Sequence, residues 1–139
     1  MTVTSPPNRQ LAIQKGGQHL TSVGLLPAEY TLADLEHIEE ALVHGTSAMR
    51  FCRIDHANLV IERIHKEYRR GEISKAERDY RVNSVYVRLG SRYGVKSQSL
   101  KAECMAMKHW PYHARIEGLT VGHYSTVPVT IPKEIAKEC

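Results

Sequence analysis

The chain lacks any apolar run as long as a membrane span, and its first residues lack the apolar core of a signal peptide. It also lacks an even set of cysteines, because Cys52, Cys104 and Cys139 are only three and are irregularly spaced. Three cysteines cannot form a closed set of disulfide pairs, which excludes a disulfide-stapled secreted domain. We therefore expect a cytoplasmic protein with reduced thiols and no membrane partner.

The motifs of the common enzyme classes are also missing. The sequence has no nucleophile elbow, no phosphate-binding loop and no closely spaced pair of carboxylates. The aspartates Asp34, Asp55 and Asp79 each have charged neighbours, as is typical of a solvated helix face. We expect no enzyme, no cofactor and no small-molecule substrate.

A metal site and a single-stranded nucleic-acid site each have one weak signal. Cys104, His109 and His113 have a Cys-x4-His-x3-His spacing that superficially resembles zinc ligands, but no fourth ligand is near and Pro111 interrupts the segment. A buried thiol and loop histidines are the favoured interpretation. Trp110 could stack on bases, but the chain has one Trp, one Phe and no alternating basic and aromatic pattern, which favours anchoring of a loop.

Positive charge is concentrated in the middle of the chain. The formal net charge is +4, yet residues 50–115 hold 15 Lys or Arg against 7 Asp or Glu, a net charge of +8. Residues 1–49 hold 2 against 5 and residues 116–139 hold 2 against 3, so both ends are mildly acidic. A basic centre is typical of a protein that binds a phosphate backbone, although a solvated basic helix face gives the same excess.

Length and helical periodicity predict a single all-α domain of five to six helices that contains a helix-turn-helix. Residues 1–18 show no sustained periodicity and predict a flexible N-terminal arm, so that the helical domain covers residues 19–139. Val82, Val85 and Val87 favour a strand by propensity, but the run leads without a break into a glycine turn and therefore favours a helix. Thr31, with Asp34 three residues on, and Ser74 are the predicted N-caps of two of the helices. The predicted helices span residues 32–43, 53–70, the segment from Ser74 to the glycine turn, 97–108, 121–127 and 132–139.

Residues 86–104 are the most informative stretch, because they place small and apolar residues where a helix-turn-helix needs them. Gly90 would let two helices approach closely, and Gly94 would take the left-handed turn conformation. Val95 and Leu100 would then pin the second helix to the first. A helical hairpin that merely ends its first helix with a glycine is the plainer interpretation of the same stretch.

One position departs from the helix-turn-helix pattern. Glu103 stands where an apolar residue is expected, three places after Leu100. Either Ala102 or Cys104 must therefore provide that packing.

The polar run after the glycine turn falls at the start and outer face of the second helix, near residues 97–108, which is the part that would enter a major groove of double-stranded DNA. A glutamine there could pair with adenine, and lysines with guanine or phosphate. The residues expected to face the groove are Lys96, Ser97, Gln98, Ser99 and Lys101, and those expected to contact the DNA backbone are Arg88, Arg92 and Arg115. A homodimer is expected, since two-fold proteins match palindromic sites.

The order of these pieces resembles a pattern in bacterial helix-turn-helix regulators of the LmbU type and, more loosely, the central domain of ParB-type partition proteins. In both, a glycine-turn helix pair is followed by a loop, an arginine, and a short helix that opens with a leucine, a polar cap and a histidine. The similarity to the LmbU-type proteins spans residues 23–138, because Gly24-Leu25-Leu26-Pro27, the helix that begins at Thr31, Phe51 and the helix from Glu62 to Gly71 resemble the region that precedes the motif in those proteins. It implies sequence-specific DNA binding by a bacterial, plasmid or phage transcription regulator. The matching residues are the run from Tyr93 to Leu100, then Trp110-Pro111, Arg115, Leu119-Thr120 and His123-Tyr124.

Two interpretations stay open beside DNA recognition. The chain could be a small interaction module or inhibitor that binds an acidic protein through its basic face; a large exposed apolar patch would favour it, whereas the short polar side chains at 97–99 suit base edges. His123 could reach a phosphate, but local packing at the junction of two helices is the favoured role.

Overall fold

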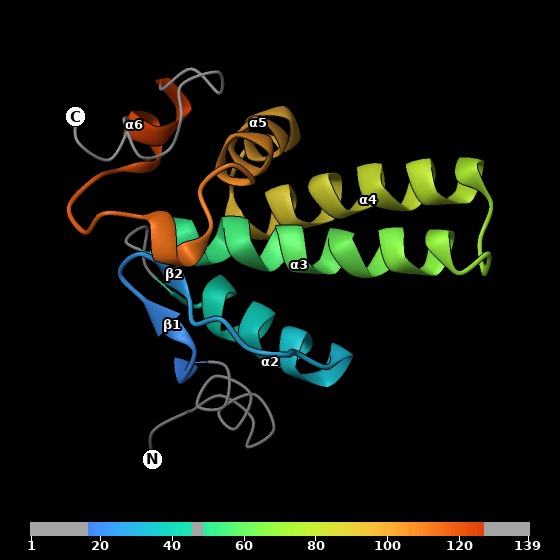
Figure 1. Ribbon diagram of the computed structural model, residues 1–139, viewed down its shortest axis with the longest axis horizontal. Helices are drawn as coiled ribbons and strands as arrows, with labels where there is room; N and C mark the ends of the chain where they lie inside the picture. Colours follow the sequence, from blue (N-terminus) through green and yellow to red (C-terminus); the bar gives the residue numbers. More distant parts are fainter. Residues whose placement is uncertain (1–16, 46–48, 127–139) are drawn as a thin grey trace, which may run out of the picture.

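The computed structural model describes residues 17–45 and 49–126, and this part of the chain is all-α in class, as predicted (Figure 1). None of the helices in these ranges is both long enough and apolar enough to cross a membrane. Most of the arm predicted over residues 1–18, and the whole helix predicted over 132–139, lie outside the described residues. The elements are β1 (Leu20–Thr21), β2 (Gly24–Leu25), α2 (Leu32–Val43), α3 (Arg50–Arg69), α4 (Lys75–Tyr93), α5 (Ser97–Met107), the 3-10 helix η2 (Tyr112–Ala114) and α6 (Val121–Thr126).

Two long antiparallel helices, α3 and α4, form a central helical hairpin (Figure 1). They are joined through Gly71, which has a φ of 75°, and α4 then begins at Ser74, whose hydroxyl accepts a hydrogen bond of 3.1 Å from the Glu77 amide. The segment that contains Val85 is therefore helical throughout, as the unbroken run predicts. The hairpin of α3 and α4 separates α2 on one side from α5 on the other (Figure 1).

Helix α2 begins where the sequence predicts. Thr31 accepts a hydrogen bond of 3.1 Å from the Asp34 amide, and the Asp34 carboxylate accepts one of 2.9 Å from the Thr31 amide, which completes a capping box. These hydrogen bonds lower the pKa of Asp34. The predicted cap at Thr31 is confirmed.

A short antiparallel pair of strands, β1 and β2, was not expected from the sequence. Leu20 pairs with Leu25 and Thr21 with Gly24, and the Leu25 amide also donates to the Asp55 carboxylate of α3 at 3.0 Å. Leu25 is buried against α3. The strands therefore extend the helical core through Leu25 and Asp55.

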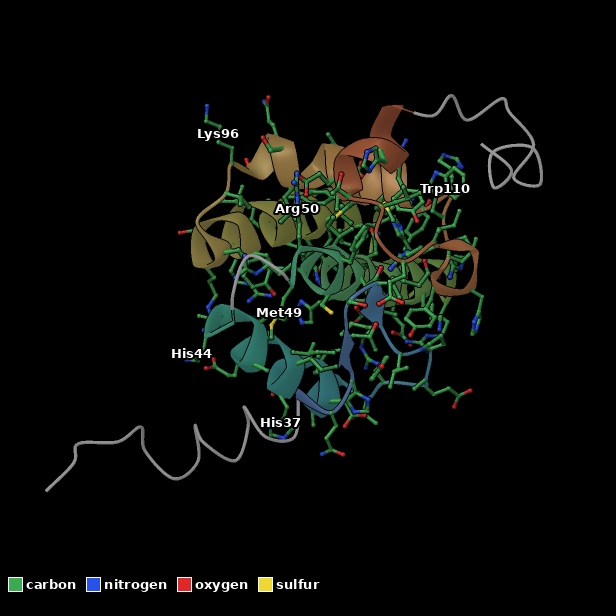
Figure 2. All side chains as sticks on the ribbon, turned by 90° about the vertical axis from the view of Figure 1, so that its left-hand side faces the viewer. His37, His44, Met49, Arg50, Lys96 and Trp110 are labelled. Atoms are coloured by element: carbon green, nitrogen blue, oxygen red, sulfur yellow. The ribbon has the colours of Figure 1, made fainter. Side chains whose placement is uncertain are left out.

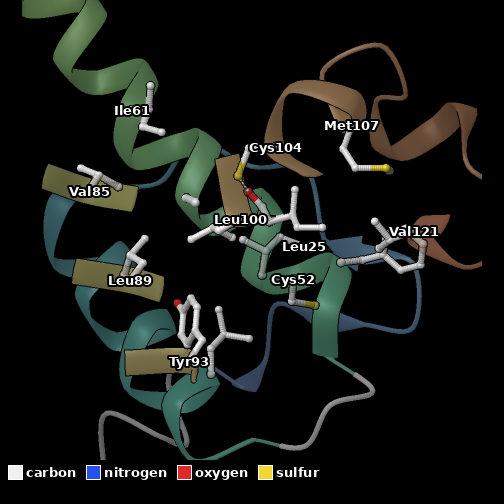
Figure 3. Close-up of a cluster of buried hydrophobic side chains, with 14 of the residues drawn as sticks. Leu25, Cys52, Ile61, Val85, Leu89, Tyr93, Leu100, Cys104, Met107 and Val121 are labelled. Carbon is white, nitrogen blue, oxygen red and sulfur yellow. Dashed lines mark hydrogen bonds between the residues drawn. The ribbon is translucent and has the colours of Figure 1, made fainter. Parts of the chain in front are cut away.

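One hydrophobic core joins these elements, and Figure 3 shows the part of it to which β2, α3, α4, α5 and α6 contribute. Buried apolar side chains from α2, α3, α4 and α5 meet at the end of the hairpin nearest α5, and α6 closes that end with Val121 and Tyr124. The largest fully buried apolar side chains are Leu35, Ile38, Leu42, Ile54, Ile61, Leu89 and Met107. Helix α5 is thus fixed to the body of the molecule rather than held by the turn alone.

Candidate nucleic-acid interface

The connection from α4 to α5 is a tight glycine turn. Gly94 has φ 71° and ψ 29°, in the left-handed region, so a side chain there would be strained. The Val95 amide donates to the Gly90 carbonyl at 2.9 Å and the Gly94 amide to the Ser91 carbonyl at 3.4 Å. These two hydrogen bonds are those of a Schellman motif, which satisfies the last carbonyls of α4 and reverses the chain toward α5.

Gly90 lets the two helices approach closely. A Cβ atom at this position would lie 2.8 Å from the Val95 carbonyl oxygen and 3.3 Å from the Ser97 Cα, and both are backbone atoms. The predicted roles of Gly90 and Gly94 are therefore confirmed. The predicted packing role of Val95 is wrong, because the residue is 43% exposed, and it is the Val95 backbone that lies against Gly90.

The inner face of α5 is apolar and buried. Leu100, Cys104 and Met107 are each at most 2% exposed and point into the core (Figure 3). Cys104, rather than Ala102, fills the position for which the sequence left two choices, since Ala102 is exposed. Burial raises the pKa of the Cys104 thiol to about 12, so this cysteine remains a protonated thiol.

Glu103, which occupies a position where the helix-turn-helix pattern has an apolar residue, lies beside the core and not in it. Its carboxylate accepts hydrogen bonds from the Arg50 guanidinium of α3, one of them 3.2 Å long from Nε. This hydrogen bonding raises the pKa of Arg50. The only acidic side chain of α5 is therefore neutralised by an arginine that lies beneath the helix (Figure 2).

The outer face of α5 carries positive and uncharged side chains. Lys96 lies at the N-terminal end of the helix, at an outer edge of the molecule (Figure 2). Ser97, the remaining residue predicted to face the groove, is half-buried against Gly90. The exposed residues from 96 to 108 that make up this recognition face are Lys96, Gln98, Ser99, Lys101, Ala102, Met105 and Lys108.

Three members of the recognition face were missed by the sequence prediction, which concentrated on the first turn of the helix. Ala102 and Met105 follow Gln98 by four and seven residues, and Met105 and Lys108 follow Lys101 by four and seven, spacings that place side chains on one side of a helix. That periodicity was the available signal. It gives a recognition face that runs the length of α5.

Arg88 and Arg92 are not part of the recognition face. Arg88 donates to the Glu39 carboxylate of α2 at 2.7 Å, and Arg92 donates to Glu39 and, at 2.9 Å, to Glu40. These guanidiniums are paired with α2, and α2 and α5 lie on opposite sides of the hairpin (Figure 1), so Arg88 and Arg92 are directed away from α5. The sequence groups them with the lysines of α5, and the structure separates the two sets.

The carboxylate that Arg88 and Arg92 share belongs to a buried polar network that sequence reasoning missed. The His56 imidazole is fully buried, and its Nε2 lies 2.9 Å from the Leu35 carbonyl, which can only accept a hydrogen bond. Nε2 therefore carries the proton, and Nδ1 accepts from the Tyr93 hydroxyl at 3.3 Å. Burial lowers the pKa of His56 to about 4, so the ring is neutral near pH 7.

Arg115, predicted to contact the DNA backbone, is instead an interior residue. Its side chain is 4% exposed, and it donates to both Asp55 oxygens at 2.7 and 2.6 Å. It also donates to the Val23 carbonyl at 2.7 Å and the Trp110 carbonyl at 2.8 Å. The guanidinium thus ties the β1–β2 turn and the α5–η2 loop to α3, and a phosphate cannot reach it.

The remaining sequence candidates have local structural contacts. His123 Nδ1 accepts a hydrogen bond of 2.9 Å from the Thr120 amide at the start of α6, in keeping with the packing role favoured for it. Trp110 is buried, with its ring 5.1 Å from that of Tyr124, and so anchors the loop as expected. Within residues 17–45 and 49–126, no group of three or more His, Cys, Asp or Glu side chains could hold a metal ion.

Comparison with protein-family models, curated proteins and solved structures finds no match to this chain. The chemistry of the recognition face is therefore what indicates a class of ligand. An exposed cationic helix whose one carboxylate is already paired favours an anionic ligand with hydrogen-bonding groups.

Proposed function

We propose that α4 and α5 form a helix-turn-helix that binds double-stranded DNA in a sequence-specific manner, and that the protein is a bacterial, plasmid or phage transcription regulator. The observation that supports this most is the recognition face itself. It is rigidly seated by the Gly90 and Gly94 turn, and it exposes lysines and uncharged groups while Glu103 is paired with Arg50. The resemblance to regulators of the LmbU type points the same way.

The dimensions of α5 suit a major groove. Its 11 residues extend roughly 16 Å at ~1.5 Å per residue, and the major groove of B-DNA is about 12 Å wide and admits an α-helix. Lys96, Lys101 and Lys108 are placed to meet phosphates or guanine, and Gln98 is placed to pair with adenine. These lysines replace Arg88, Arg92 and Arg115 as the proposed backbone contacts, because the arginines hold carboxylates of the protein.

A homodimer would place two copies of α5 in successive major grooves, about 34 Å apart along the duplex. A single helix contacts few base pairs, so doubling the half-site is the usual route to specificity. The spacing of half-sites in the preferred DNA sequence reports on this arrangement directly.

The test is selection from a random duplex library, followed by fluorescence anisotropy with the selected duplex and a scrambled duplex at several salt concentrations. We expect the selected duplex to bind more tightly and to retain that advantage as salt rises. Gln98→Ala should relax the preference at one base pair at a cost of about 1–3 kcal/mol. Equal and steeply salt-dependent binding to both duplexes, or no binding, would contradict the proposal.

A second candidate function is the binding of an acidic protein segment, and a groove on the opposite side of the molecule favours it. The groove has a volume of about 950 Å³ and lies between the start of α2 and the hairpin of α3 and α4. Its lining combines apolar side chains with five cationic and three acidic ones, an excess of positive charge that suits an amphipathic acidic helix. The lining includes Leu32, Leu59, Val60, Arg63, Lys66 and Tyr80.

A further inference from the structure

We propose that Met105, together with Ala102, reads the 5-methyl groups of thymine, so that the protein selects A·T base pairs at the centre of its half-site. This inference rests on the proposed DNA-binding function and adds to it the identity of the bases that are read. It concerns the one large apolar side chain on an otherwise polar and cationic face.

The position of Met105 gives the first reason. It is 53% exposed, although Leu100 and Met107 of the same helix are at most 2% exposed. Packing in the core therefore does not explain the position of Met105, because the residues of α5 that are buried in the core are others. Single exposed apolar side chains are common on protein surfaces, so Met105 gains its significance from its place in the middle of the face that the proposed function turns toward DNA.

The neighbours of Met105 give the second reason. Gln98, Ala102 and Met105 are separated by four and three residues, and so form one stripe along the exposed side of α5. Lys101 and Lys108 are exposed as well and are suited to phosphates or guanine. The stripe therefore presents one amide followed by two apolar groups to whatever lies against the centre of the helix.

The chemistry of the major groove identifies the base that such a stripe fits. Thymine is the only base that carries a methyl group there, and adenine is the base that a glutamine amide pairs with in two hydrogen bonds. Ala102 supplies a short methyl contact, and the unbranched, polarisable side chain of Met105 can adapt to a methyl at greater depth. A·T pairs satisfy both kinds of group.

The experiment uses the duplex obtained by selection and replaces its thymines one at a time by deoxyuridine, which removes only the methyl group. For the wild type we expect a loss of about fourfold in affinity at one or two thymines, the effect of leaving one methyl group unburied. Met105→Ala should bind the thymine duplex more weakly and lose the difference between thymine and uracil at one of these positions. Met105→Leu should keep that difference.

Val87→Ala is the matched control, because Val87 is also 53% exposed but lies on α4. It should leave both the affinity and the thymine preference unchanged. Specific binding by the wild type with no loss at any uracil overturns the inference and leaves the proposed function standing. The inference also fails if Met105→Ala weakens thymine and uracil duplexes equally. Absence of duplex binding by the wild type overturns the proposed function, and this inference with it.

Discussion

Arginines and lysines make different kinds of contact in the basic central region, residues 50–115. Arg50, Arg88, Arg92 and Arg115 each hold a carboxylate of another element, whereas the lysines of the recognition face are exposed. The planar guanidinium can bind a carboxylate through two donors, as Arg115 does with Asp55. Many of the positive charges of this region therefore stabilise the fold, and its net charge alone does not show where a ligand binds.

Arg115 and Lys101 should respond to substitution in opposite ways. Arg115→Ala removes one partner of a buried ion pair, so we expect the free energy of unfolding to fall by about 3–5 kcal/mol with little change in DNA affinity of the folded protein. Lys101→Ala removes an exposed charge, so we expect stability within about 0.5 kcal/mol of the wild type and weaker binding to all duplexes. Urea unfolding and anisotropy measure the two effects. A stable Arg115→Ala variant with weakened DNA binding would contradict the structural role.

His56 should make the fold sensitive to mild acid. Burial, acting against attraction from Glu39, lowers its pKa from 6.5 to about 4, so the unfolded chain takes up a proton in this range and the folded chain does not. The stabilisation is complete above the unfolded pKa and is lost as the pH falls toward 4. The charged groups facing the ring are Glu39 of α2 and Arg88 and Arg92 of α4.

The expected size of this loss is about 2 kcal/mol of unfolding free energy between pH 7 and pH 5. Urea unfolding of the wild type and of His56→Gln at both pH values measures it, and the variant should show a flatter profile. Burial raises the pKa of Glu39, but hydrogen bonds from Arg88 and Arg92 outweigh that effect and leave the pKa lowered. The stability that the ionised Glu39 carboxylate contributes is therefore lost only at a lower pH, in the wild type and in His56→Gln alike. Equal slopes between pH 7 and pH 5 would contradict the account of His56.

The α4–α5 turn depends on close backbone contact. Gly90→Ala gains helix propensity of up to about 1 kcal/mol, but its Cβ would lie 2.8 Å from the Val95 carbonyl oxygen, a backbone atom. We expect a net destabilisation of about 1–3 kcal/mol together with weaker DNA binding, because α5 must move. Ser91→Ala on the same helix is the control and should change neither. A stabilised Gly90→Ala variant with unchanged affinity would show that the approach of the two helices is not required.

The helices could be predicted from sequence because their ends carry local signals. Thr31 with Asp34, Ser74 with Glu77 and the turn at Gly94 each act within a few residues, so the starts of α2 and α4 and the turn before α5 were found. The strands β1 and β2 have two residues each, too few for an alternating pattern to emerge. The network around Glu39 could not be found, because its partners Arg88 and Arg92 lie 49 and 53 residues away and its own sequence resembles a solvated helix face.

The two sides of the α3–α4 hairpin differ in charge. Helix α2 lies across the hairpin from α5 (Figure 1) and contains no Lys or Arg. Its Glu39 and Glu40 are held by Arg88 and Arg92, and Asp34 and Glu36 carry its remaining negative charge. The recognition face has no exposed carboxylate. This separation orients the protein toward a polyanion with α5 in front and α2 behind.

Mapping the DNA contact by NMR tests this orientation most directly. Amide spectra of the ¹⁵N-labelled protein are recorded while the selected duplex is added, and the residues whose signals shift are located on the structure. We expect shifts concentrated between residues 96 and 108, with α2 and the tip of the hairpin near Gly71 little affected. Shifts confined to the groove beside Leu32 and Tyr80 would contradict it and favour that groove as the functional surface.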